Sequence, residues 1–105
     1  MKARPGEIWL ADLGLAAKTR PILIVSRNDE NPPRALVLYV PLTTQFRGSA
    51  YEIEIGRVNF LNEHSYANIQ GLGSLPLVRL ERFLGKLSPE FILKVKDGIR
   101  FALDL

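Results

Sequence analysis

Short apolar runs fill the first two-thirds of the chain, and stretches rich in proline, glycine, asparagine and aspartate separate them. Runs of this length between turn-forming residues are typical of β-strands. The pattern predicts six strands, at residues 7–13, 21–25, 35–42, 51–55, 65–70 and 78–83. The second and third runs are almost continuously apolar, which is typical of strands buried on both faces. The loop between these two runs contains two prolines and two asparagines, which favour turns.

Apolar residues recur with one period in the fourth run and with another near the end of the chain. Apolar positions alternate in the fourth run and should face a core, whereas Glu52 and Glu54 should face water as a solvated pair. After Ser88, which is suited to cap a helix, apolar residues recur every three to four positions to about Leu103. Short strands followed by one terminal helix predict a mainly β fold, a small and partly open β-barrel in a single domain over residues 1–105.

Composition narrows the class of protein. With 105 residues, of which 47% are hydrophobic and 24% charged, the chain fits one globular domain. The lack of cysteine excludes disulfides, thiolate metal sites and cysteine nucleophiles, and a single histidine excludes a multi-histidine metal centre within one chain. No apolar run approaches the ~20 residues of a membrane span, and the start lacks the apolar core of a signal peptide. These features predict a cytoplasmic protein without a membrane partner.

The positive charge is concentrated in the first half of the chain. The net charge is +3; residues 1–50 hold seven Lys or Arg against four acids, whereas residues 51–105 hold seven of each sign. A lopsided basic surface favours a polyanionic partner such as nucleic acid. Because many small domains carry a similar net charge, the same numbers also fit a protein with no such partner.

Arg20 and Thr43 are the residues best placed for chemistry. Arg20 immediately precedes the second apolar run, and Thr43 immediately follows the third. If these two strands are antiparallel neighbours, the start of one lies beside the end of the other. A guanidinium fork and a hydroxyl at one sheet edge would suit a phosphodiester. The alternative is that Arg20 is a solvated strand-edge residue and Thr43 merely starts a turn.

Four segments resemble the MazF/PemK family of toxin endoribonucleases, which belong to toxin–antitoxin modules. They read GEIWLAD, KTRPILIVS, VPLTTQFRG and RLERFLGKLSPE, and they occur in the expected order over nearly the whole chain. The resemblance implies an SH3-like, partly open β-barrel that forms a homodimer and cleaves single-stranded RNA. It also implies neutralisation by a cognate antitoxin peptide, contact with operator DNA only through that antitoxin, and no cofactor.

The resemblance assigns roles to the two candidate residues. Arg20 matches the arginine of the family's RP motif and Thr43 the first threonine of its T-[ST]-Q motif, which together form the catalytic pair. The implied chemistry uses no metal: an RNA 2′-OH attacks the adjacent phosphorus and leaves 2′,3′-cyclic phosphate and 5′-OH ends. Arg20 would stabilise the developing negative charge, and Thr43 would hold the phosphate in line.

Five more residues are candidates for substrate binding: Lys18, Thr44, Gln45, Arg47 and Gln70. Arg47 could equally be a solvated loop charge. Trp9 offers a ring for base stacking, although an aromatic residue in an apolar strand more often belongs to the core. His64 follows polar residues and is expected in a surface loop rather than as a general base.

Two regions depart from the family's pattern. Residues 14–19 form an unusually short first loop without an acid, and residues 70–75 lack the family's usual arginine after Gln70. Arg79 matches the family's RL motif, and it could contact RNA or brace the barrel. The RNA cleavage sequence therefore cannot be transferred, and two alternatives stay open: a CcdB-like toxin that binds gyrase, and a non-catalytic relative that binds RNA or antitoxin.

Overall fold

This computed structural model describes residues 3–14 and 18–105. The described residues contain seven strands, two single-turn helices and a longer C-terminal helix. Residues 15–17 of the short first loop lie outside the described residues. The strands are β1 Glu7–Asp12, β2 Thr19–Ile24, β3 Leu36–Thr43, β4 Glu52–Gly56, β5 Ser65–Asn68, β6 Gly73–Pro76 and β7 Leu80–Lys86. Two single-turn helices, η2 Ile69–Gly71 and η3 Leu77–Arg79, precede β6 and β7, and α1 spans Pro89–Leu103.

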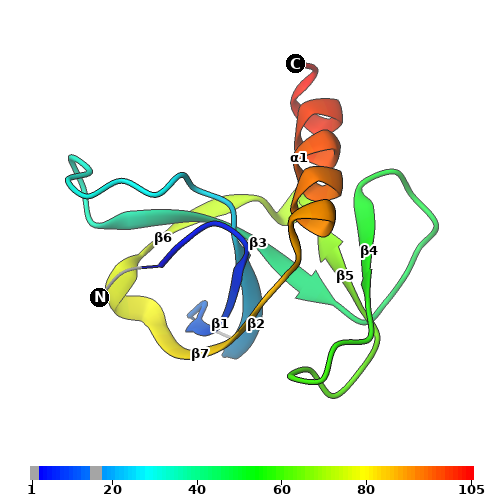
Figure 1. The fold of residues 1–105 in the computed structure, drawn as a ribbon, viewed down its shortest axis with the longest axis horizontal. Helices are drawn as coiled ribbons and strands as arrows, with labels where there is room; N and C mark the ends of the chain where they lie inside the picture. The colour runs from blue at the N-terminus through cyan, green and yellow to red at the C-terminus, as the bar shows by residue number, and fades with distance from the viewer. Residues whose placement is uncertain (1–2, 15–17) are drawn as a thin grey trace.

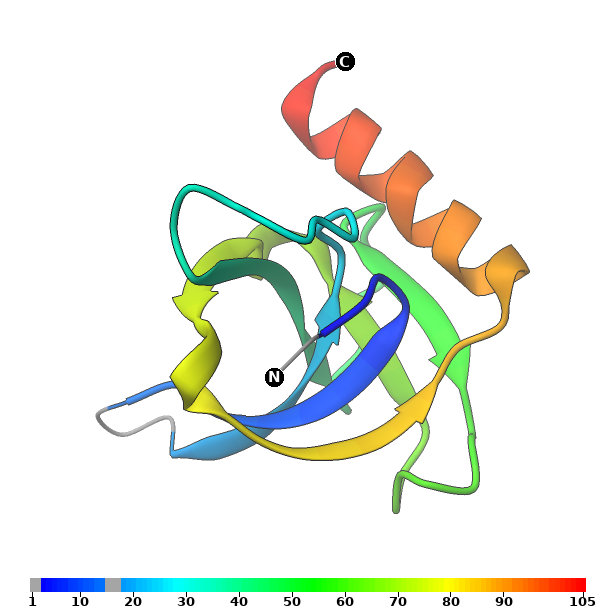
Figure 2. The same ribbon diagram turned by 60° about the vertical axis from the view of Figure 1, so that its left-hand side comes forward.

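The strands form one strongly curved antiparallel sheet that closes incompletely (Figures 1 and 2). Its order is β4-β5-β3-β2-β1-β7, and β6 pairs with the first half of β3 while β5 pairs with the end of the same strand. Helix α1 packs against β4 and η2, and its C-terminal end projects away from the strands (Figure 1). The predicted mainly β fold with a partly open barrel and a terminal helix is confirmed.

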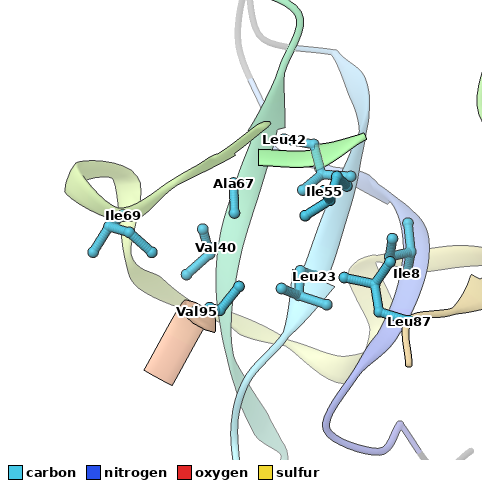
Figure 3. Close-up of a cluster of buried hydrophobic side chains, with 9 residues drawn as sticks. All are labelled: Ile8, Leu23, Val40, Leu42, Ile55, Ala67, Ile69, Leu87 and Val95. Carbon is cyan, nitrogen blue, oxygen red and sulfur yellow. The ribbon is translucent and has the colours of Figure 1, made fainter. Parts of the chain in front are cut away.

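The core consists of two hydrophobic clusters on opposite faces of β2 and β3. Figure 3 shows the larger, which draws side chains from β1 to β5, η2, the segment after β7 and α1: Ile8, Leu23, Val40, Leu42, Ile55, Ala67, Ile69, Leu87 and Val95. The smaller cluster comprises Ala11, Ile22, Ile24, Val37, Leu75 and Leu80. Successive residues of β2 enter different clusters, so the prediction that this strand is buried on both faces is confirmed.

The main differences between predicted and observed strands concern β3, β5, β7 and β6. The first half of β3 is not buried on both faces, because Leu36 and Leu38 are 40% and 49% exposed. The strand predicted at 65–70 ends at Asn68, and the one predicted at 78–83 starts at Leu80, since a helical turn occupies one end of each. β6 was not predicted; its four residues, GSLP, are too few to show a period.

The terminal helix was predicted correctly. It begins after Ser88, with a proline in its first turn, and ends before Asp104, whose left-handed backbone stops the helix. Ser88 occupies the N-cap position, but its side chain makes no capping hydrogen bond, so that part of the prediction is wrong. Among the described residues, no helix combines the length and the apolar character that crossing a membrane requires.

Candidate active site

Strand pairing brings Arg20 and Thr43 together at one edge of the sheet. β2 and β3 are antiparallel neighbours, as predicted, with Ile22 opposite Pro41. Arg20 and Thr43 each lie two residues beyond this pair, at the same edge of the sheet. Both residues line one cleft of about 640 Å³. An exposed guanidinium and a half-buried hydroxyl therefore share a space that a nucleotide chain could enter.

Thr43 is oriented by the residues that follow it. The backbone N–H of Gln45 donates to Thr43 Oγ1 over 3.1 Å. Because the hydroxyl oxygen accepts this bond, its hydrogen is available to donate to another group. Thr44 and Gln45 line the same cleft as Arg20 and Thr43. The hydroxyl of Thr43 thus has one fixed partner and one direction left for a ligand.

A second cleft of about 360 Å³ adjoins the first and shares Thr43 and Gln45 with it. It also contains Arg47 and Gln70, which come from the β3–β4 loop and from η2. Arg47 Nη2 donates to Gln45 Oε1 over 3.4 Å. The two clefts together contain all the predicted site residues except Lys18, which is exposed just before β2 and lines neither.

Glu52 holds the loop that carries these residues. Its carboxylate accepts hydrogen bonds from the backbone N–H of Arg47 at 3.0 and 3.1 Å, and from the N–H and hydroxyl of Ser49 at 3.1 Å each. These bonds, first among them the one from the Ser49 backbone, lower the pKa of Glu52 below its ordinary value. Glu52 is therefore at the surface, as predicted, but it is more than a solvated partner of Glu54, because the loop folds back to bond with its carboxylate.

Arg82 is a cleft residue that the sequence did not reveal. It lies on β7 opposite Leu10, and Leu10 lies opposite Pro21 on its other side, so the three form a row across the sheet. Arg82 lines the same cleft as Arg20. Only the register of β1 with β7 shows that Arg82 reaches the cleft.

Arg79, three residues before Arg82, lies outside both clefts. Its guanidinium approaches Asp12 Oδ2 to 3.9 Å, a position that suits bracing the end of β1.

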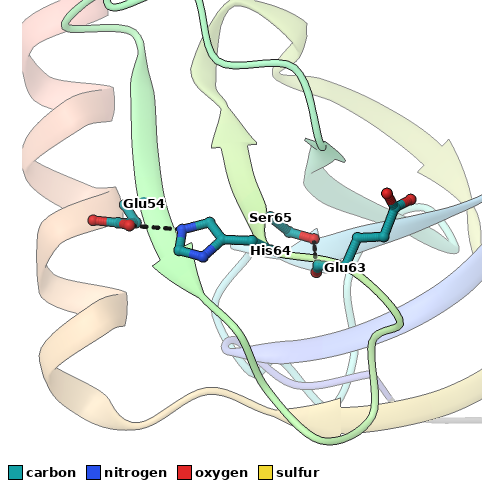
Figure 4. A network of polar contacts seen from close by, with 4 residues as sticks. All are labelled: Glu54, Glu63, His64 and Ser65. Carbon is teal, nitrogen blue, oxygen red and sulfur yellow. Dashed lines mark hydrogen bonds and ion pairs between the residues drawn. The ribbon is translucent and has the colours of Figure 1, made fainter.

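The other candidates point away from both clefts. The indole of Trp9 donates to Glu7 over 3.0 Å, packs edge-on against Phe83 and contacts the smaller core cluster, which favours a core role. His64 Nε2 lies 2.6 Å from Glu54 Oε2 and lines neither cleft (Figure 4). Across the described residues, no three His, Asp or Glu side chains gather as metal ligands would.

The fold and the two clefts define a class of protein: a small, partly open β-barrel with a terminal helix that presents arginine, hydroxyl and amide groups in one continuous groove. Residues 4–103 match the family described as PemK-like, MazF-like toxin of type II toxin–antitoxin systems. The chain therefore belongs to this family, and the resemblance seen in its sequence motifs is confirmed.

Individual relatives agree with this membership. The endoribonuclease MazF3 of Mycobacterium tuberculosis is 36% identical over 89 residues, which cover 83% of this chain and 86% of the relative. A solved mycobacterial endoribonuclease in complex with its cognate antitoxin has 30% identity and a TM-score of 0.85, over 98% of this chain and 96% of the other. A MazE–MazF structure from Deinococcus radiodurans, at 16% identity and a TM-score of 0.81 over 100% and 98% of the two chains, shares the fold.

Proposed function

We propose that this protein is an endoribonuclease toxin that cuts single-stranded RNA without a metal ion, with Arg20 and Thr43 as its catalytic pair. The observation that carries the proposal is the cleft that Arg20 and Thr43 line together at one edge of the paired strands β2 and β3. Relatives at 36% and 33% identity are named endoribonucleases, which favours this function over a CcdB-like gyrase-binding toxin.

The chemistry needs only groups that the cleft and the RNA supply. The 2′-oxygen attacks the adjacent phosphorus, the bond to the 5′-oxygen breaks, and the 2′-OH proton is transferred overall to that leaving oxygen. Arg20 stabilises the negative charge that develops on the non-bridging oxygens. A guanidinium offers only N–H donors and no acceptor, so Arg20 does not serve as the base. Thr43, whose oxygen already accepts from Gln45, donates to the phosphate and holds it in line.

The rest of the two clefts would bind the nucleotides that flank the cut. Thr44, Gln45, Arg47 and Gln70 present hydroxyl, amide and guanidinium groups to bases and backbone. Lys18, outside both clefts, would contribute only long-range attraction that salt screens.

The protein would act in the cytoplasm, as a homodimer that joins two basic faces into a longer groove. An acidic, partly disordered antitoxin peptide would cover that groove. The solved mycobacterial endoribonuclease in complex with its cognate antitoxin supports an antitoxin partner. Contact with operator DNA would then occur only through the antitoxin.

End mapping on a defined RNA tests the proposal. The purified protein should yield 2′,3′-cyclic phosphate and 5′-OH ends, and Arg20→Ala or Thr43→Ala should slow cleavage by about 10²–10³-fold with an unchanged circular dichroism spectrum. Arg27→Ala is the matched control, because Arg27 is exposed beyond the other end of β2 and lines neither cleft. Normal cutting by Arg20→Ala would refute the assignment. Gyrase-dependent DNA breaks would indicate the CcdB-like function, and RNA binding without cutting a non-catalytic relative.

A further inference from the structure

A stacked pair of aromatic rings lies beside Thr43. Tyr66 on β5 is directly opposite Thr43 on β3. The ring of Phe46, from the β3–β4 loop, lies on the ring of Tyr66 with centroids 4.7 Å apart and an angle of 14° between the planes. Phe46 is nevertheless 56% exposed. An apolar ring is thus held flat against a second ring on the strand next to Thr43, with much of its surface in water; neither ring is among the residues that line the two clefts.

The strand register fixes where this pair stands relative to the catalytic groups. Glu54, Tyr66 and Thr43 form one row across β4, β5 and β3. Arg20 lies at the same edge of the sheet, near the start of β2, which pairs with β3 on the side away from β5. Tyr66 and Arg20 therefore come from the two strands that flank the end of β3.

Neighbouring groups hold the pair in place. The imidazole of His64 contacts the ring of Tyr66 at 5.3 Å between centroids, and His64 is itself bound to Glu54 (Figure 4). Residues on both sides of Phe46 line the clefts: Gln45 lines both and Arg47 the second. The exposed ring thus stands between two side chains that can hydrogen-bond to the edge of a base.

We propose that the Phe46–Tyr66 pair is a stacking platform for the unpaired RNA base next to the cleaved linkage. This inference rests on the proposed function and adds to it a determinant of substrate binding. Single-stranded RNA is recognised largely by bases splayed onto aromatic rings. Loss of one such stacking contact weakens binding by about 5- to 150-fold. The platform also tolerates different bases, so Gln45 and Arg47 would supply any base preference at this position.

The chain provides a matched control in Phe101 on α1. Its exposed fraction is also 56%, and it also contacts a tyrosine, Tyr51, at 5.3 Å between centroids. Phe101 lies in the groove between α1 and β4 and lines neither cleft of the candidate site. Replacing either phenylalanine by leucine removes a ring of equal exposure, but only Phe46→Leu removes one beside Thr43.

The experiment uses a single-stranded RNA that the protein cuts, made uncleavable, or blocked, by a 2′-O-methyl group at the cleaved linkage. The fluorescent base 2-aminopurine replaces each nearby base in turn. Stacking on an aromatic ring should quench the fluorescence at one position next to the block. Phe46→Leu should abolish that quenching and weaken binding at least 5-fold, whereas Phe46→Tyr and Phe101→Leu should retain both. In steady-state cleavage of the unblocked RNA, Phe46→Leu should raise KM far more than it lowers kcat.

Binding to blocked RNA is measured without cleavage, so the platform and the catalytic assignment can fail separately. If Phe46→Leu keeps the affinity and the quenching while the wild type cuts RNA, the platform is refuted and the proposed function stands. If Phe46→Leu weakens only an acidic antitoxin peptide and not RNA, the ring docks protein and the platform is likewise refuted. If quenching depends on Phe46 but Arg20→Ala cuts normally, the platform stands and the catalytic pair is wrong.

Discussion

Arg82 gives a quantitative test of how the cleft holds a nucleic-acid backbone. Because Leu10 lies opposite both Arg82 and Pro21, two strand spacings of together about 10 Å separate Arg82 from β2. A phosphate held at Arg20 would therefore sit roughly 10 Å from the second guanidinium, where the attraction is about 0.4 kcal/mol in bulk water and about 1.7 kcal/mol at an effective dielectric constant of 20. Arg82→Ala should thus weaken RNA binding by roughly 2- to 16-fold.

The salt dependence of binding sharpens this prediction. Each phosphate neutralised on a single strand contributes about 0.7 to the slope of log affinity against log salt. Arg82→Ala should lack one such contact and lose less affinity as salt rises. Raising the salt from 50 to 200 mM should therefore reduce the ratio of wild-type affinity to Arg82→Ala affinity by about 2.6-fold.

Fluorescence anisotropy with cleavage-blocked RNA over this salt range measures both quantities. Arg100→Ala is the control, because Arg100 lies on α1, outside both clefts, with its guanidinium 3.0 Å from Asp97; it should keep the wild-type slope. An Arg82→Ala variant with the wild-type slope at every salt concentration would refute the contact.

Two further predictions concern the support of the site. Because hydrogen bonds lower the pKa of Glu52 below 4.5, they should persist at neutral pH and be lost as the pH falls through that lowered pKa. The amide NMR shifts of Arg47 and Ser49 should titrate together below pH 4.5, and the same titration should be seen in Glu54→Gln. Amide shifts that stay constant with pH would contradict this. A Cβ at Gly98 would lie 3.1 Å from Ile53 and 3.2 Å from Ile69, so in Gly98→Ala a crowding cost of about 1–3 kcal/mol should exceed a helix-propensity gain of about 1 kcal/mol. Urea unfolding should show net destabilisation; stabilisation by Gly98→Ala would contradict the close approach.

The meeting of Arg20 and Thr43 could be predicted because it depends on a pairing between two strands that follow each other along the chain. Two apolar runs of similar length flank one loop rich in turn-forming residues, and such neighbours along the chain usually pair. Once they are paired antiparallel, the start of one must lie beside the end of the other. No side-chain detail is needed for this step, and the structure places both residues in one cleft.

Arg82 and Tyr66 could not be predicted because their positions depend on registers set far along the chain. Arg82 enters the cleft through the pairing of β7 with β1, which contains two register shifts. Tyr66 reaches Thr43 because β5 takes the end of β3 while the unpredicted β6 takes its start. A slip of one residue would turn either side chain to the opposite face. Alternation within a strand thus gives the face of a residue but not its neighbour across the sheet.

The role of Glu52 could not be predicted for a different reason, and this residue connects the fold to substrate binding. Alternation along β4 is blind to the loop, which turns back at Gly48 with φ of 72° and aims backbone N–H groups at the carboxylate. The loop is then fastened at both ends, by Thr43 Oγ1 at Gln45 and by Glu52 at Arg47 and Ser49. Since ordering a free loop on binding costs entropy, a loop fastened in advance binds substrate more tightly. Loosening it should therefore impair binding by the residues between the two ties more than the chemistry of Thr43, which remains on β3.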